Sequence, residues 1–158
     1  MENAFAGLIQ SLSAQLQVEL EIKDNIKAHV NFDDIALLIE HLPEAEQVLL
    51  AAPVADVPAN GREYLYRALL QGQYIFAGTL GATLALDKEE SFVCLQIAPS
   101  LRALTRENFP ALVENFLNMV EHWRRRCLEI AQQADGQAGP GGLGIGPEAA
   151  PEAGMLRI

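Results

Sequence analysis

The sequence predicts an α+β fold in which helices and strands follow one another in the order α-β-β-β-α-β-β-α. Apolar residues recur at helical spacing over residues 4–18, 62–77 and 109–130, which predicts three amphipathic helices. Short apolar or alternating runs lie between these helices and are separated by turn residues, which predicts five strands. From residue 135 onward glycine, proline and alanine predominate, so we expect one domain at 1–134 and a flexible tail at 135–158.

The first helix is predicted from an apolar stripe that lies on one helical face. Its members are Phe5, Leu8, Ile9, Leu12 and Leu16, which follow Phe5 at offsets of 3, 4, 7 and 11 residues. Glutamine and serine fill the opposite side. Residues 18–22 then alternate strictly between apolar and acidic side chains, so we expect the chain to leave this helix in an extended conformation.

Three consecutive strands are expected at residues 28–32, 35–39 and 48–52. Asp33 and Asp34 supply the turn between the first two. The run 35–39 is apolar on both faces, which is typical of a strand that is covered on each side. Pro53 has no N–H to donate, so the third strand should end there, contain a bulge or lie at a sheet edge.

The second helix, at 62–77, has a buried line that includes Leu65, Leu69, Gly72 and Phe76. An exposed glycine in mid-helix costs about 1 kcal/mol relative to alanine. We therefore expect Gly72 to permit close approach by another element, such as the same helix of a second subunit.

A hairpin at 82–87 and 91–98 and a long last helix complete the domain. In the second hairpin strand Val93, Leu95 and Ile97 are the more uniformly apolar set and should face the core. Thr105 or Asn108 could cap the last helix, and the sequence does not choose between them.

Charge and hydropathy exclude several classes of function. The chain of 158 residues has a formal net charge of −10, which repels phosphate backbones and argues against nucleic-acid binding. No basic segment precedes an apolar one at the N-terminus, and the longest apolar run is too short to span a bilayer. We expect a cytoplasmic protein without membrane insertion.

No pattern in the sequence indicates catalysis, a metal or a cofactor. Cys94 and Cys127 are the only cysteines and lack metal-ligand spacing. The histidines His29, His41 and His122 are scattered, with no pair spaced for zinc. The glycine-rich stretch 142–146 is not followed by the helix that a phosphate-binding loop requires. We therefore expect a protein that is not an enzyme and that needs no cofactor.

Apolar surface is the feature that remains. The first helix has more leucine than a small sheet needs, and only one face of the strand at 35–39 can meet a single layer of helices. An uncovered apolar face usually marks a partner site. Such a face could be covered by a second copy of the chain or by an extended or helical peptide from a partner.

Several local patterns resemble a known family. They are the segments 5–9, 65–73, 78–87 and 93–96, together with Leu12, Leu16, Phe109, Leu112, Val113, Phe116 and Trp123. Over roughly residues 5–131 the chain resembles the class I chaperones of bacterial type III secretion, the family that includes the Tir chaperone. Gln73 departs from the asparagine that is common there, and the tail is longer than in many relatives.

This resemblance implies a homodimer with a twisted antiparallel sheet and helices. Such chaperones bind the N-terminal segment of a secreted effector in extended form, keep it soluble and deliver it to the secretion apparatus in a transient contact. For client binding we expect the residues Leu8, Leu12, Leu16, Leu37, Ile39, Val48 and Leu50. For the dimer interface we expect Leu65, Leu69, Gly72 and Phe76.

Two alternatives remain open at this point. A regulatory adaptor would bind a cytoplasmic anti-activator or another control protein instead of an exported effector, and the sequence does not separate the two roles. A small enzyme would need a convergent set of polar residues, and the sequence shows none.

Overall fold

The computed structural model describes residues 4–137. The tail predicted at 135–158 lies outside the described residues from residue 138 onward, and residues 135–137 belong to the last helix instead. The helices and strands are α1 (Ala4–Leu16), β1 (Ile22–Lys23), β2 (Lys27–Phe32), β3 (Ile35–Leu42), β4 (Gln47–Asp56), α2 (Arg62–Gln73), β5 (Thr83–Leu86), β6 (Phe92–Ile97) and α3 (Phe109–Gln137). Short 3₁₀ turns occur at Pro43–Ala45, Tyr74–Phe76 and Leu101–Ala103. This order confirms the predicted α+β class. The two-residue strand β1 was not predicted as a strand, and the extended segment expected at 18–22 overlaps it only at Ile22.

The strands form one six-stranded antiparallel sheet in the order β1-β2-β3-β4-β6-β5. The helix α2 is inserted between β4 and β5, and β6 therefore pairs with β4 while β5 becomes an edge strand. The strand β4 runs through Pro53, and the pairing register with β6 shifts between Pro53 and Ala55. Of the outcomes that the sequence left open for this proline, the structure shows the bulge.

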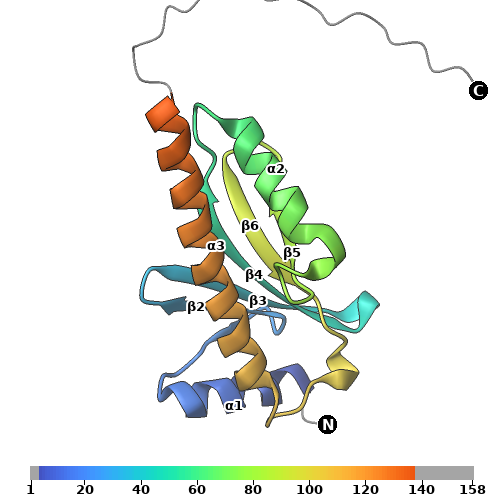
Figure 1. Ribbon diagram of the computed structural model, residues 1–158. Helices are drawn as coiled ribbons and strands as arrows, with labels where there is room; N and C mark the ends of the chain where they lie inside the picture. Colours follow the sequence, from blue (N-terminus) through green and yellow to red (C-terminus); the bar gives the residue numbers. More distant parts are fainter. Residues whose placement is uncertain (1–3, 138–158) are drawn as a thin grey trace, which may run out of the picture.

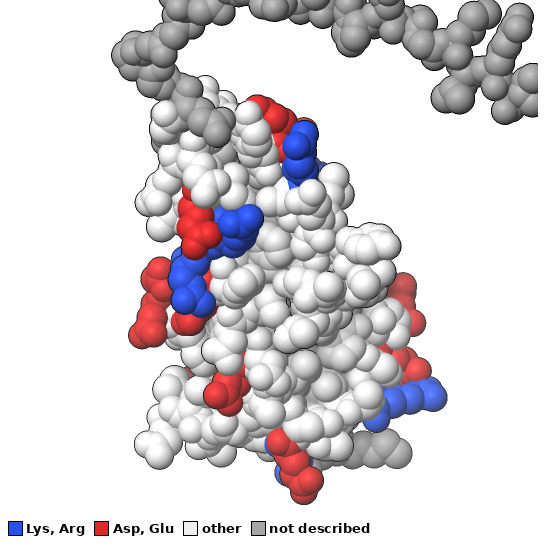
Figure 2. All heavy atoms as spheres, in the orientation of Figure 1, with Lys and Arg blue, Asp and Glu red and all other residues white. Residues whose placement is uncertain are grey.

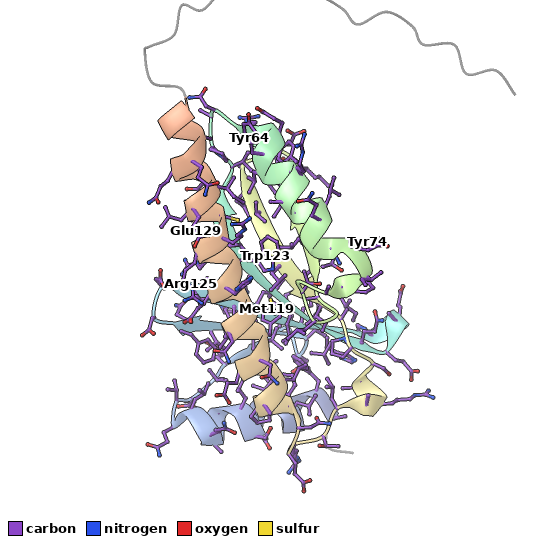
Figure 3. All side chains as sticks on the ribbon, in the orientation of Figure 1. Tyr64, Tyr74, Met119, Trp123, Arg125 and Glu129 are labelled. Carbon is purple, nitrogen blue, oxygen red and sulfur yellow. The ribbon has the colours of Figure 1, made fainter. Side chains whose placement is uncertain are left out.

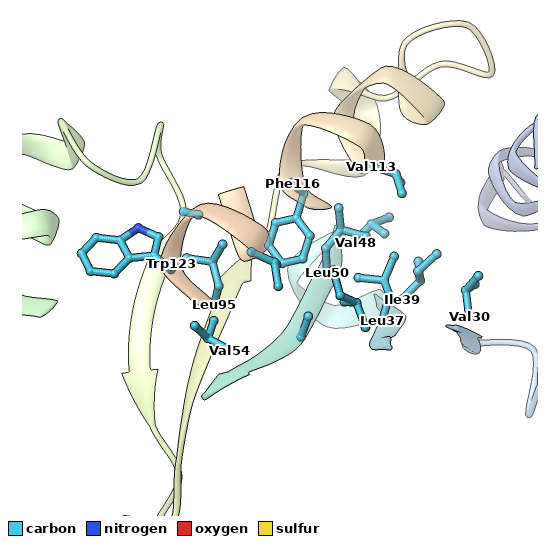
Figure 4. Close-up of a cluster of buried hydrophobic side chains, with 14 of the residues drawn as sticks. Val30, Leu37, Ile39, Val48, Leu50, Val54, Leu95, Val113, Phe116 and Trp123 are labelled. Atoms are coloured by element: carbon cyan, nitrogen blue, oxygen red, sulfur yellow. The ribbon is translucent and has the colours of Figure 1, made fainter. Parts of the chain in front are cut away.

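The helices cover one face of the sheet. Figure 1 shows α2 and α3 side by side in front of the strands, with α1 crossing the lower end of α3. Side chains that point toward this layer are buried, as the alternation along β3 and β4 shows. Figure 4 shows how side chains from the sheet and from α3 fill the core, among them Leu50, Leu95 and Phe116. Burial of such aliphatic and aromatic side chains contributes roughly 1.5–3 kcal/mol each.

The N-terminus of α3 is fixed by two residues that bond to each other. The Thr105 N–H donates to Asn108 Oδ1 at 2.8 Å, and the Asn108 N–H donates to Thr105 Oγ1 at 3.1 Å. This reciprocal arrangement satisfies two backbone donors that a helix start leaves unpaired. The sequence left a choice between the two residues as a cap, and the structure uses both.

Glycine at position 72 has a specific packing reason. A Cβ on Gly72 would lie 2.3 Å from the indole ring of Trp123 on α3, which no real contact allows. The indole also donates its Nε1–H to the Gly78 carbonyl at 2.9 Å. The close approach predicted for Gly72 is therefore made by α3 of the same chain. Contact of Gly72 with a second subunit stays a prediction.

Candidate partner-binding surfaces

Most residues that the sequence suggested for client binding lie in the chain's own core. All but Leu16 are buried: Leu8, Leu12, Leu37, Ile39, Val48 and Leu50. The physical reason is the two-residue period of the strands, because the helices cover the face that carries Leu37 and Ile39 and leave the opposite face uncovered. The prediction that these strand residues face a client is corrected, since the wrong face of the sheet was chosen.

The residues suggested for a dimer interface are likewise partly buried and partly exposed. Leu65 and Leu69 are buried under α2, and Gly72 packs against Trp123. Phe76 is exposed, as an interface residue of a single chain should be. The helix predicted at 62–77 ends at Gln73, so Phe76 lies in the turn that follows it and not on the helical line. The line through Leu65 and Leu69 is the inward side of α2.

The outer side of α2 and the turn after it carry a continuous set of exposed apolar side chains, here named the α2 ridge. Its members are Leu70, Tyr74, Ile75, Phe76 and Leu80. Leu70 is 74% exposed and Ile75 is 75% exposed, which is unusual for large apolar residues in a protein of this size. Figure 3 shows Tyr74 on the side of α2 that faces away from α3.

The turn that carries the α2 ridge has a strained backbone. Ile75, Phe76 and Leu80 have φ values of 49°, 56° and 49°, in the left-handed region that apolar residues rarely adopt. Each such residue costs of order 1–3 kcal/mol. The hydroxyl of Thr79, in the same turn, is buried without a hydrogen-bond partner among the described residues. These costs are consistent with a segment whose conformation is completed by a partner.

The uncovered side of the sheet is a second apolar surface, here named the open sheet face. It comprises His29, Asn31, Ala36, Leu38, Ala51, Pro53, Phe92 and Cys94. These residues line a shallow hollow of about 410 Å³, and cross-strand pairs such as Leu38 with Ala51 place them on one side. None of these lining residues is an aspartate, glutamate, lysine or arginine. The Lys27–Glu40 ion pair continues the same side of β2 and β3 beyond the hollow.

A third surface is the α1–α3 groove, of about 380 Å³, which lies where the end of α1 meets the first half of α3 and the β2–β3 turn. Its apolar lining is Leu12, Leu16, Phe32, Ile35, Pro110, Val113 and Leu117, and its polar lining is Gln15, Asp33, Asp34, Glu114, Asn118 and Glu121. The turn is tied to α3 by an ion pair in which Arg124 Nη1 lies 2.7 Å from Asp34 Oδ2. This pair is largely exposed and contributes at most about 1 kcal/mol, so its effect is to position the groove wall.

Sequence reasoning found Leu12 and Leu16 but missed the part of the groove that α3 supplies. Positions 110, 114, 117, 118 and 121 repeat at helical spacing beside the buried stripe of α3, to which Val113 itself belongs. That signal was present in the sequence. Which element would cross α3 there, and so turn one helix face into a groove, could not be inferred from it.

The structure shows little that could support chemistry. Within residues 4–137 no group of three or more histidine, cysteine, aspartate or glutamate side chains is arranged to hold a metal ion. Burial raises the pKa of the Cys94 thiol, and burial raises that of Cys127 to about 11. Both thiols are therefore protonated and weakly nucleophilic at neutral pH. None of the helices described here is both long and apolar enough to cross a bilayer.

Fold and surfaces together define a one-sided α+β protein with several uncovered apolar surfaces, which is the form of a partner-binding protein. Figure 2 shows the helix side of the molecule, where uncharged residues make up most of the visible surface. Residues 7–124 match the model of the Tir chaperone protein (CesT) family. Because that match covers most of the chain, the chain belongs to this family of chaperones. This confirms the family that the sequence patterns indicated.

Solved structures share the fold. A chain of the ExsC–ExsE complex is 24% identical, with a TM-score of 0.66 over 76% of this chain and 90% of that chain. A chain of the HopA1–SchA chaperone–effector complex is 17% identical, with a TM-score of 0.63 over 77% and 94% of the two chains. A chain of the ExoU–SpcU complex from the type III secretion system of Pseudomonas aeruginosa is 14% identical, with a TM-score of 0.60 over 78% and 96%. No curated protein sequence matches the chain.

Proposed function

We propose that this protein is a homodimeric, cytoplasmic type III secretion chaperone. It binds the N-terminal segment of an exported effector in extended form and keeps that effector soluble and ready for secretion. The observation that carries the proposal is the one-sided sheet, because a single layer of helices leaves apolar surface without a partner in the chain itself. Membership of the Tir chaperone family supports the same role, and binding alone requires no catalytic residue.

The three surfaces suit different parts of such an assembly. The α2 ridge is the natural site for the second subunit, because it is the most exposed apolar set and is strained in the single chain. The open sheet face and the α1–α3 groove lie away from that ridge and remain for the client. Leu16 stays among the proposed client residues, and Phe76 among the proposed dimer residues.

The test is affinity capture of the tagged protein from its native cytosol, followed by limited proteolysis and mass spectrometry of what remains bound. We expect a protected N-terminal stretch of one exported protein. Recovery of a non-exported control protein would instead establish the regulatory adaptor. Recovery of no partner from an intact dimer, in cells that export effectors, would contradict both roles.

A further inference from the structure

We infer that the α1–α3 groove selects a client segment in which apolar anchor residues stand next to lysine or arginine. This inference rests on the proposed function and states what chemistry the client must have at this one surface. It follows from the arrangement of an apolar floor and an acidic rim in the same groove.

The floor of the groove is apolar and partly accessible. Leu16, Phe32 and Leu117 are only half-buried, although they pack against the core. Their exposed surface costs free energy in water, at about 25 cal/mol per Å² of apolar area. A volume of about 380 Å³ accommodates a few side chains of an extended peptide and is too small for a folded partner.

The rim of the groove is acidic. Asp33 and Asp34 come from the β2–β3 turn, and Glu114 and Glu121 come from α3, where they are two turns apart on one face. Of these four carboxylates, only Asp34 has a basic partner among the described residues, Arg124. Asp33, Glu114 and Glu121 are exposed and have no ion-pair partner within residues 4–137, so the groove has a surplus of negative charge.

The acidic rim distinguishes this groove from the other two surfaces. The residues that line the hollow of the open sheet face and those of the α2 ridge include no aspartate, glutamate, lysine or arginine. Beside the hollow, Lys27 and Glu40 neutralise each other in an ion pair. The groove is therefore the one of the three surfaces whose lining has a surplus of charge with which to distinguish clients. A basic residue beside an apolar anchor would meet the rim, whereas an acidic one would be repelled there. The net charge of −10 favours the same partner at longer range.

The test uses a short fluorescein-labelled peptide that alternates leucine and arginine in a glycine/serine background, with binding followed by fluorescence anisotropy. Matched peptides replace the arginines by glutamate or the leucines by serine. We expect the leucine/arginine peptide to bind best and its affinity to fall as ionic strength rises. Replacement of either residue type should weaken binding, because floor and rim both contribute.

The groove is identified by charge reversal. Glu121→Lys should weaken binding of the leucine/arginine peptide roughly fivefold to tenfold, because an attractive contact becomes a repulsive one. Glu44→Lys is the matched control: it makes the same change of net charge at an exposed site outside the groove, and it should have a much smaller effect. Leu16→Ser tests the floor without changing charge and should also weaken binding.

Two results would overturn the inference. One is equal loss of affinity in Glu121→Lys and Glu44→Lys, which would mean that only overall charge matters. The other is undiminished binding of the serine peptide, which would mean that the floor takes no part. Capture of an effector from cytosol that is unaffected by Glu121→Lys and Leu16→Ser would leave the chaperone role intact and refute this groove as the client site.

Discussion

Adjacent residues on a strand of this protein lie on opposite faces of the sheet and differ in burial, and β3 shows this most clearly. Leu37 is 1% exposed and lies under the helices, whereas Leu38 lies on the open sheet face. Both are leucines in an apolar run, so their chemistry alone does not separate them. Substitution of Leu37 should therefore affect the stability of the fold, whereas substitution of Leu38 should affect the binding surface.

We predict that Leu37→Glu unfolds or severely destabilises the protein, by more than about 4 kcal/mol, because it places an unpaired carboxylate in the core. Leu38→Glu is the matched variant and should cost about 1 kcal/mol or less, because its side chain reaches water. Urea unfolding followed by circular dichroism measures both. Similar losses in the two variants would contradict the assignment of faces.

A second residue-scale prediction concerns Gly72. Gly72→Ala should lower the free energy of unfolding by about 1–3 kcal/mol, because the new methyl group overlaps the Trp123 ring and the ring is held by its hydrogen bond to Gly78. The better helix propensity of alanine, about 1 kcal/mol, offsets only part of this. Gly136→Ala on α3 meets no atom within 4 Å and should instead leave stability unchanged or raise it slightly. Stabilisation by both substitutions would refute the packing argument.

These residues also show which structural features could be predicted from the sequence. Periodicity predicted the helices, the strands and the inward set Val93 and Leu95, because burial follows the pitch of each element. It could not predict which face of β3 the helices cover or which helix fills the space at Gly72. Those depend on contacts between segments distant in sequence, as does the groove that α1 and α3 form together.

At the scale of elements, the turn of the β5–β6 hairpin is organised by one carboxylate. Asp87 Oδ1 accepts the N–H of Phe92 at 2.8 Å and the N–H of Ser91 at 2.6 Å. These bonds to the charged form hold the pKa of Asp87 below its ordinary value of 3.8, with the Phe92 N–H as the largest cause.

Stability should therefore depend on pH through this hairpin. A carboxyl whose pKa is lower in the folded state contributes stability that is complete above 3.8 and is lost as pH falls through the folded-state value. We predict that Asp87→Asn is less stable than the wild type at neutral pH and that the difference shrinks below pH 3.8. Urea midpoints of both proteins across this range provide the measurement, and a pH-independent gap would argue against the carboxylate.

At the scale of the whole molecule, the α2 ridge should decide the oligomeric state. We predict that Leu70→Glu converts the proposed dimer to a folded monomer, because two charges would be buried against apolar surface when the subunits meet. Gln10→Glu adds a charge at an exposed position on α1, away from the ridge, and should remain dimeric. Size-exclusion chromatography with light scattering distinguishes the two, and a dimeric Leu70→Glu protein would place the interface elsewhere.

The two cysteines report on the open sheet face. Cys94 is half-buried on that face, and Cys127 is buried on the inner side of α3, with a pKa of about 11. We predict slow alkylation of Cys94 in the native protein and no alkylation of Cys127 until the protein is unfolded in urea. A bound client that covers the face should protect Cys94. Equal native reactivity of both thiols, read by mass spectrometry, would contradict the placement.

Trp123 gives the molecule a built-in optical probe. It is the only tryptophan, so the intrinsic emission of the protein arises from one buried site between α3 and the residues 72–78. That site lies directly behind the α2 ridge. Any rearrangement of the strained turn when subunits join or separate would alter the surroundings of the indole, so assembly could be followed by dilution in the unlabelled, unmodified protein.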